Sequence, residues 1–386
     1  MLKKHFSYFL GTNPGFLHAA AHSHHPWPDV TEAAHRQYWL ISATQVDRKW
    51  QSVVDGVEER AKVHVARLIG APAPEQIVFA PNVHEFCARL YSCLPLDRPA
   101  RVLSSAHEFH SFTRQTRRLV EAGRVSWETV PADPYDSFAA RFAARLASEK
   151  WDMVWLSHVF FDSGFRVDDL EALVRVGFDD GIFVIDGYHA FCALPVDIGP
   201  FAQRAFYTAG GYKYAMAGEG ACFLAVPPGN TLRPVNTGWW GDFESLAKPQ
   251  EGPVGYSPSA ESFRGSTADL SGLLRFNAVW DLMDSLGVTP ATIHAHVDAL
   301  EAQFLDGLDA LGLARLQTRH LVPPRGVPRG NFLTFDCPDA EDIELRLKSA
   351  NIYMDRRGTR LRFGFGVYHD AEFIDQLLAA VKSALQ

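Results

Sequence analysis

The chain has 386 residues, of which 47% are hydrophobic and 21% are charged, and its formal net charge at pH 7 is −8. This is the composition of a globular protein, and the length is enough for one large and one small domain. The negative charge argues against binding nucleic acid through a basic surface. Five cysteines without a Cys-x-x-Cys pair argue against a disulfide framework and favour a reducing cytoplasm. The longest apolar runs are too short for a membrane-spanning helix, so we expect no membrane contact.

The first half of the chain alternates helical and extended patterns. Apolar residues recur at helical spacing from Val53 to Leu68, which predicts a helix that ends at Gly70. Short apolar stretches predict strands at 77–80, 101–104, 125–130, 152–158, 182–186, 205–209 and 221–226. Helical patterns lie between them at 112–121, 137–150 and 168–178. Such alternation predicts an α/β fold with a mostly parallel sheet between helices.

The composition and periodicity of the sequence change after residue 231. Residues 231–262 are rich in Pro, Gly, Trp and Ser and predict a long functional loop. Helical patterns then follow at 270–286, 293–311 and 340–350, with strand patterns at 332–336, 352–355 and 360–365 and a last helix. We therefore expect three parts: residues 1–50 as a segment that lines the active site, residues 51–267 as a large domain, and residues 268–386 as a small α+β domain.

Chemically useful residues follow five of the predicted strands. They are Asn82-Val83-His84, Phe109, Ser163, Asp186 with His189, and Tyr212-Lys213. Because ligands of open α/β sheets bind beyond the carboxyl ends of the strands, we expect these residues to converge. Pyridoxal 5′-phosphate needs such a set: a lysine for its aldehyde, a carboxylate for its ring nitrogen, a helix N-terminus for its phosphate and an aromatic side chain for its ring. The sequence therefore predicts this cofactor.

Two short segments carry a family resemblance. Ile185–Ala190 reads Ile-Asp-Gly-Tyr-His-Ala, and Tyr212–Tyr214 reads Tyr-Lys-Tyr. They resemble the class V aminotransferase superfamily of fold-type I enzymes, and within it the kynureninase group. The resemblance implies a large domain with a mostly parallel, seven-stranded type of sheet and a small C-terminal α+β domain. It implies that Lys213 carries the cofactor, that Asp186 keeps the ring nitrogen protonated and that Tyr212 holds the phosphate.

The same resemblance implies further contacts. For the cofactor these are Phe109, which would stack on its ring, and Val83, His84, Ser163 and His189. Trp239 in Gly238–Gly241 and Thr267 after Ser262–Ser266 would reach the phosphate of a neighbouring subunit, so a homodimer with shared active sites is expected. Arg362, with Arg357 as a second candidate, would hold the carboxylate of an amino-acid substrate.

The implied reaction is hydrolytic cleavage of a Cβ–Cγ bond, with a class V aminotransferase as the alternative. A cysteine desulfurase or selenocysteine lyase is disfavoured, because Cys337 follows a predicted strand and does not lie in a Gly-rich loop. The sequence leaves the identity of the amino-acid substrate open. The Thr-rich phosphate loop of the family is Asn82-Val83-His84 here, and Thr267 stands where kynureninases have Asn.

A histidine cluster near the start of the chain offers a different kind of site. His18, His22, His24 and His25 could together bind a transition metal. However, Pro26-Trp27-Pro28 follows at once, and no carboxylate lies nearby in the sequence. We therefore interpret the cluster as a polar loop at the mouth of the active site and predict no metal, while a metal enzyme remains the alternative from another class.

Overall fold

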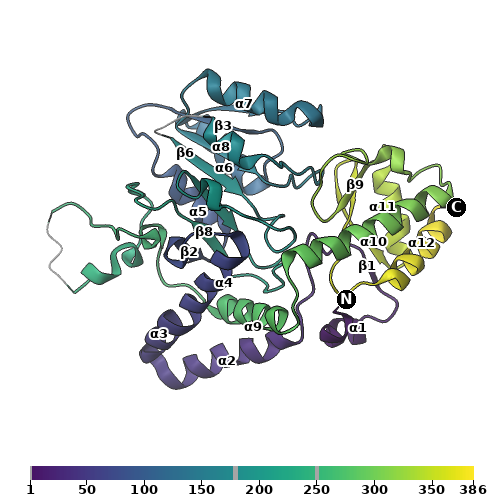
Figure 1. Ribbon diagram of the computed structural model, residues 1–386, viewed down its shortest axis with the longest axis horizontal. Coiled ribbons are helices and arrows are strands. Elements are labelled where there is room, and N and C mark those ends of the chain that lie inside the picture. Colours follow the sequence, from purple (N-terminus) through teal and green to yellow (C-terminus); the bar gives the residue numbers. More distant parts are fainter. Residues whose placement is uncertain (1, 177–180, 248–251) are drawn as a thin grey trace.

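The computed structural model describes residues 2–176, 181–247 and 252–386. Its centre is a seven-stranded sheet with the strand order β2-β8-β7-β6-β5-β3-β4 (Figure 1). The strands are β2 (Ile77–Ala80), β3 (Ala100–Ser105), β4 (Val125–Val130), β5 (Met153–Ser157), β6 (Ile182–Asp186), β7 (Ala205–Ala209) and β8 (Cys222–Ala225). Strand β8 pairs antiparallel with both β2 and β7, and the other pairs of neighbouring strands in this sheet are parallel. The α/β fold with a mostly parallel sheet is therefore confirmed.

Both faces of the sheet are apolar and covered by helices. The side chains of Ile77 and Phe79 belong to one buried cluster, and those of Val78 and Ala80 belong to the other. Such continuous burial is typical of a parallel sheet between two layers of helices. One layer contains α5 (Val83–Tyr91) and α6 (His110–Glu121). The other contains α4 (Glu59–Ile69), α7 (Phe138–Ser148) and α8 (Leu170–Arg175).

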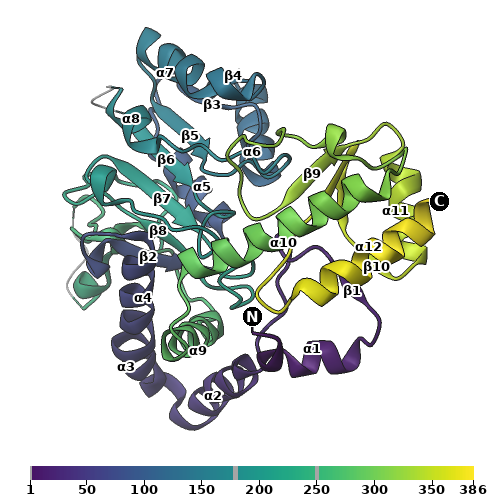
Figure 2. The same ribbon diagram turned by 45° about the vertical axis from the view of Figure 1, so that its right-hand side comes forward.

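The C-terminal part adds a smaller antiparallel sheet in the order β11-β12-β9. The elements of the C-terminal part are α9 (Ser271–Ser285), α10 (Pro290–Leu311), β9 (Leu333–Asp336), α11 (Ala340–Ser349), β10 (Ile352–Tyr353), β11 (Asp355–Arg357), β12 (Arg360–Phe363) and α12 (Ala371–Leu385). Helix α9 packs against α2 (Val30–Gln45) and α4, whereas α10 packs against α12 (Figures 1 and 2). The division of the chain near residue 267 stays a prediction.

The N-terminal segment runs beside the C-terminal part of the chain. It contains α1 (Ser7–Thr12), β1 (Leu17–His18), α2 (Val30–Gln45) and α3 (Lys49–Ser52). Strand β1 pairs in parallel with β10, and Ala20 forms a further bridge to Gly364 (Figure 2). Residues 17–20 therefore join the N-terminal segment to the C-terminal part of the chain.

Some predicted boundaries shift in the structure. The helix expected from Val53 begins with a π-helical turn, Val53–Glu58, and ends as predicted at Gly70, which adopts a left-handed conformation with φ 65°. The loop expected at 231–262 contains 3-10 turns at Trp239–Ser245 and Ala260–Phe263. Residues 248–251 of that loop, and residues 177–178 of the helix expected at 168–178, lie outside the described residues. In the described part of the chain, no helix is long and apolar enough to cross a membrane.

Candidate active site

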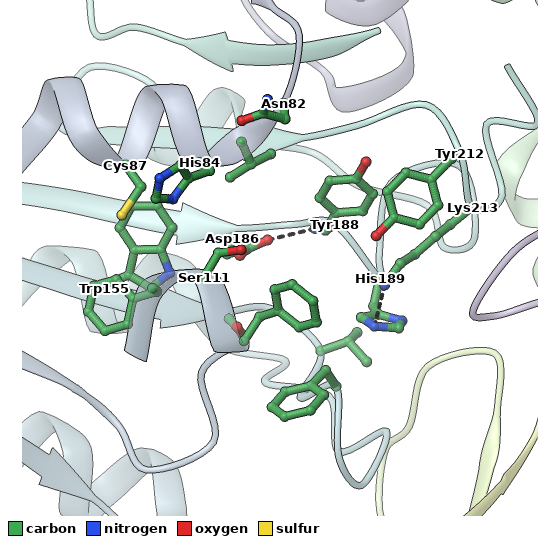
Figure 3. Close-up of a pocket in the computed structure, with 16 residues that line it drawn as sticks. Asn82, His84, Cys87, Ser111, Trp155, Asp186, Tyr188, His189, Tyr212 and Lys213 are labelled. Atoms are coloured by element: carbon green, nitrogen blue, oxygen red, sulfur yellow. Dashed lines mark hydrogen bonds between the residues drawn. The ribbon is translucent and has the colours of Figure 1, made fainter. Parts of the chain in front are cut away.

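A cavity of about 300 Å³ lies where the strands of the large sheet end. Its walls come from residues 82–87, 109–112, 155–161, 186–189 and 212–213 (Figure 3). These segments lie at or after the carboxyl ends of β2, β3, β5, β6 and β7. In the sequence, chemically useful residues follow these same five strands. The expected convergence is thus present for the residues that follow β2, β3, β6 and β7, whereas the segment after β5 lines the cavity without Ser163.

Lys213 reaches into the cavity from the turn that follows β7. Its side chain is buried, with Nζ 2.5 Å from His189 Nε2 and 5.1 Å from the centre of the Tyr188 ring (Figure 3). Burial lowers the pKa of Lys213 to about 7, and the charge of Arg362 acts in the same direction, while Asp186 and Asp355 oppose it. Near neutral pH a large share of Lys213 is therefore a neutral, nucleophilic amine.

Asp186 is the last residue of β6 and also lines the cavity. Its Oδ1 accepts a hydrogen bond of 3.0 Å from the backbone N–H of Tyr188. Burial raises the pKa of Asp186 to about 6, although the Tyr188 N–H and the charge of Lys213 favour the ionised form. A buried carboxylate of this kind gains most from a cationic partner that enters the cavity.

The N-terminus of α5 faces the same cavity. Asn82 caps this nine-residue helix, since its Oδ1 accepts a 3.0 Å hydrogen bond from the N–H of Glu85. Val83 and His84 line the cavity in the first turn. Free N–H groups and the positive end of the helix dipole favour an anion at this position.

The donor set fits pyridoxal phosphate. Lys213, Asp186 and the start of α5 border one cavity, and the ring of Phe109 lies on its wall with its centre 6.0 Å from Lys213 Nζ. Within the described chain, His189 Nδ1 is buried without a hydrogen-bond partner, so a polar group of a ligand can satisfy it. Tyr212 lines the cavity too, and burial raises its pKa to about 12.

Ser163 takes a place different from the one expected. It is fully buried, and its Oγ accepts a 3.2 Å hydrogen bond from the N–H of Phe165 within its own turn. The residues that line the cavity do not include it. The structure therefore does not bring Ser163 to the other predicted cofactor contacts.

The two predicted substrate arginines gather around an aspartate. Arg362 is buried, its Nε donates to Asp355 Oδ1 at 2.7 Å, and its Nη2 donates to Asp355 Oδ2. Its Nη1 donates to the carbonyl oxygen of Phe161, which lines the cavity. Arg357 is more exposed, with Nη2 3.6 Å from Asp355 Oδ2. Arg362 thus lies beside the cavity but already has a carboxylate partner.

Trp239 and Thr267 lie away from the cavity. Both are exposed, and Trp239 packs against the rings of Trp240 and Phe243 in a segment that extends away from the sheet at the left of Figure 1. Neither residue lines the cavity of its own chain. Their predicted contact with a neighbouring subunit stays a prediction.

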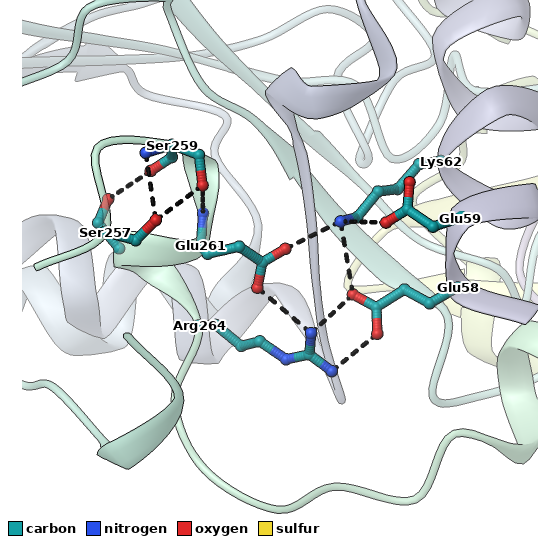
Figure 4. A network of polar contacts seen from close by, with 8 residues as sticks. Glu58, Glu59, Lys62, Ser257, Ser259, Glu261 and Arg264 are labelled. Carbon is teal, nitrogen blue, oxygen red and sulfur yellow. Dashed lines mark hydrogen bonds and ion pairs between the residues drawn. The ribbon is translucent and has the colours of Figure 1, made fainter. Parts of the chain in front are cut away.

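A buried polar network holds the chain just before Thr267 (Figure 4). Arg264 donates to both carboxylate oxygens of Glu58, at 2.8 and 2.7 Å. Lys62 bonds to Glu59 and Glu261, each at 2.9 Å. Burial raises the pKa of Glu58, against the opposing charge of Arg264. The network fixes the segment 257–264 to the start of α4.

The four N-terminal histidines have separate neighbours. His18 Nδ1 lies 2.6 Å from the Tyr368 hydroxyl, and His25 packs edge-on against the same ring. His24 stacks on Tyr212 with ring centres 5.0 Å apart, and His22 faces His189 at 6.5 Å. Among the described residues, no group of three or more His, Cys, Asp or Glu side chains is placed to hold a metal ion.

Sequence reasoning overlooked several residues of the cavity wall. Tyr188, Trp155 and Ser157 all line it. Tyr188 belongs to the recognised Asp-Gly-Tyr-His segment, and Ser157 ends β5, so position at a strand end was an available signal for both. Trp155 carried no such signal, because apolar residues of a strand face either layer of helices.

Comparison with known proteins places nearly the whole chain in one family. The profile of the family described as aminotransferase class V matches residues 16–377. A probable cysteine desulfurase of Vibrio cholerae is 25% identical over 348 residues, which are 85% of this chain and 82% of that protein. Isopenicillin N epimerase of Streptomyces clavuligerus is 28% identical over 219 residues, covering 55% of this chain and 52% of that protein.

Solved structures share the fold along nearly the whole chain. The apo cysteine desulfurase of Thermococcus onnurineus NA1 has a TM-score of 0.78 at 18% identity, covering 96% of this chain and 94% of that one. The cystine C–S lyase C-DES, solved with cysteine persulfide, has a TM-score of 0.79 at 17% identity, covering 96% and 98%. None of these four proteins is a kynureninase, so the narrower resemblance stays a hypothesis.

Proposed function

The chain belongs to the class V aminotransferase family of pyridoxal-phosphate-dependent enzymes, and we propose that it hydrolyses the Cβ–Cγ bond of an amino acid, as kynureninases do. One observation carries the proposal that the cofactor binds here: Lys213, Asp186 and the N-terminus of α5 border a single cavity. When bound, pyridoxal phosphate supplies an aldehyde and a ring that accepts electrons.

Each residue of the site has a role that its surroundings support. Lys213 would hold the aldehyde carbon, and its amine, when released, would take a proton from Cα of the substrate. Its lowered pKa supports that role, since the neutral amine is the base. Asp186 would pair with the protonated ring nitrogen, and the first turn of α5 would hold the phosphate. His189, which is hydrogen-bonded to Lys213, would orient the amine.

The hydrolytic branch rests on two features of the chain. The segments Asp186–Ala190 and Tyr212–Tyr214 have the kynureninase pattern. The thiols also do not favour sulfur transfer. Cys337 is fully buried, Cys87 is buried in the cavity wall, and burial raises the pKa of both, that of Cys337 to about 12. Neither thiol has the thiolate character that a sulfur-accepting nucleophile needs.

The second candidate is a cysteine desulfurase or a related C–S lyase, which the names of the relatives favour. The test is an assay of products from the cofactor-loaded enzyme. L-kynurenine should give anthranilate, followed by its fluorescence, and alanine in equal amounts. Sulfide release from L-cysteine without anthranilate from L-kynurenine would support the second candidate. Amino-group transfer from L-alanine to a 2-oxo acid, with neither other product, would indicate an aminotransferase.

We also propose a homodimer in which Trp239 and Thr267 reach the active site of the partner subunit. Trp239, Phe243 and Leu246 are exposed large apolar side chains on one extended segment. A second copy of the chain is a suitable cover for such a surface, because exposed aromatic clusters commonly mark interfaces. The rigid attachment of residues 257–264 by Arg264 and Glu58 supports a fixed position of Thr267.

A further inference from the structure

Asp355 occupies the edge of Arg362 by which an arginine binds a carboxylate. The two residues lie directly opposite each other on the antiparallel strands β11 and β12. Arg362 Nε donates to Asp355 Oδ1 at 2.7 Å, and Nη2 donates to Oδ2. This is the bidentate arrangement that an arginine otherwise offers to a substrate carboxylate. The remaining nitrogen, Nη1, holds the carbonyl oxygen of Phe161.

Asp355 has two further neighbours. His22 Nε2 lies 3.4 Å from its Oδ1, and Arg357 Nη2 lies 3.6 Å from its Oδ2. His22 is fully buried with its ring stacked on Phe332 at 4.6 Å, and burial lowers its pKa to about 4, so it is neutral near pH 7. Although burial disfavours its charge, His22 and Arg362 keep the pKa of Asp355 below its ordinary value. Two arginines and one aspartate therefore leave one net positive charge in this group.

We propose that Asp355 determines substrate specificity by matching this group to an amino acid with a single carboxylate. The inference rests on the proposed function and on the expectation, made from the sequence, that Arg362 receives the carboxylate of the amino-acid substrate. One carboxylate neutralises the single net positive charge. A second carboxylate leaves an uncompensated negative charge beside Asp355, in a region where Asp355 and Arg362 are both buried. Removing charges from water is costly unless they are paired, so substrates with an acidic side chain are rejected.

The substitution Asp355→Asn removes the negative charge of the side chain and nearly preserves its shape. An asparagine keeps an oxygen that can accept from Arg362 Nε, but the net charge of the group rises by one unit. A substrate with two carboxylates then meets two positive charges. The variant should therefore gain affinity for acidic amino acids, whereas Asp355→Glu, which retains the charge, should not.

The experiment compares L-asparagine with L-aspartate, which have nearly the same shape and differ in charge. Each is titrated into cofactor-loaded enzyme, and the half-saturating concentration is read from the visible absorption of the cofactor. L-glutamine and L-glutamate form a second pair. An amino acid that causes no spectral change is measured as a competitor of L-alanine. The matched control is Asp342→Asn, which removes an exposed carboxylate of α11 that pairs with Arg315 and Arg346.

We expect the wild-type enzyme to prefer each amide over its acid by about tenfold or more, because one unpaired charge near a buried group costs at least that much. In Asp355→Asn this preference should fall by about tenfold, while Asp355→Glu and Asp342→Asn retain it. An unchanged preference in Asp355→Asn would overturn the proposal. So would loss of binding of both members of a pair in a folded Asp355→Asn enzyme, because Asp355 would then only hold Arg362 in place. Failure of the proposed function looks different: the wild-type enzyme would respond to no amino acid, L-kynurenine included.

Discussion

Lys213 Nζ and His189 Nε2 lie 2.5 Å apart inside the cavity, and both side chains are buried. Burial lowers the pKa of both groups, and for His189, whose pKa falls well below its ordinary value, the charge of Lys213 acts in the same direction. The pair therefore carries at most one positive charge near neutral pH. Burial, with the charge of Arg362 acting in the same direction, explains how this amine can be ready to react without a strong external base.

Replacement of Lys213 tests the attachment of the cofactor. Lys213→Ala should abolish the adduct that borohydride fixes between protein and cofactor, because only a primary amine at this place can form it. Mass spectrometry of peptides from the wild-type enzyme locates the adduct. The peptide with Lys62, which is also buried, is the internal control. An adduct on any lysine other than Lys213 would contradict the assignment.

The lowered pKa of Lys213 predicts how cofactor attachment depends on pH. The neutral amine is the reactive form, and its fraction rises with pH through about 7 rather than through the ordinary value of 10.5. The rate of attachment to cofactor-free enzyme should therefore increase between about pH 6 and pH 8 and then level off. Stopped-flow absorbance measures this rate. A rise centred near pH 10 would mean that the surroundings do not lower the pKa of the Lys213 amine.

Replacement of Asp186 tests the electrostatic contact to the ring. Asp186→Asn keeps the shape and removes the negative charge at the end of β6. Turnover should fall by about 10²–10³-fold, the usual effect of removing one electrostatic contact to the reacting group. Melting temperature and cofactor content should change little. Near-normal turnover would show that Asp186 has a structural role only.

The Glu58–Arg264 pair predicts a large effect on stability. Arg264→Gln leaves Glu58 buried without its bidentate partner, so the free energy of unfolding should fall by about 3–5 kcal/mol. Urea unfolding measures the change. The double variant with Glu58→Gln should recover part of the loss, because no charge is then stranded. Arg325→Gln, which breaks an exposed pair with Asp306, should cost less than about 1 kcal/mol.

Shared active sites can be tested with mixed dimers. Trp239→Ala and Lys213→Ala chains should each form inactive or weak enzymes. If each site takes Lys213 from one subunit and Trp239 from the other, a mixed dimer holds one site with both defects and one with neither. Activity should then exceed that of either parent. If mass measurement shows mixed dimers and no activity returns, each site is built from one chain.

Much of the fold was predictable because its signals are local. The strand ends at Ala80, Asp186 and Ala209 are marked by apolar runs followed by turn residues, and Gly70 is the left-handed residue that ends α4. Helix α2 gave no such signal. It exposes most of its surface, so its apolar residues do not repeat with a clear helical period.

The site was predictable where its chemistry lies at strand ends, and not where it depends on contacts between distant segments. Nothing local indicates that Asp355 pairs with Arg362, because that depends on the register of β11 and β12. The approach of His22 to Asp355 depends on the pairing of β1 with β10, which joins residues more than 300 positions apart. Ser163 does not line the cavity, because its turn folds back so that its Oγ accepts from the N–H of Phe165.

The place of β2 in the sheet has a consequence during protein synthesis. Its neighbour in the sheet is β8, and about 140 residues separate Ala80 from Cys222. At roughly 5–20 residues per second, a ribosome needs on the order of ten seconds to make that interval. For this time the apolar strand Ile77–Ala80 has no hydrogen-bonding partner in its own sheet, and such an edge attracts other chains. Nascent chains that stop before residue 222 should therefore need chaperones more than those that reach residue 226.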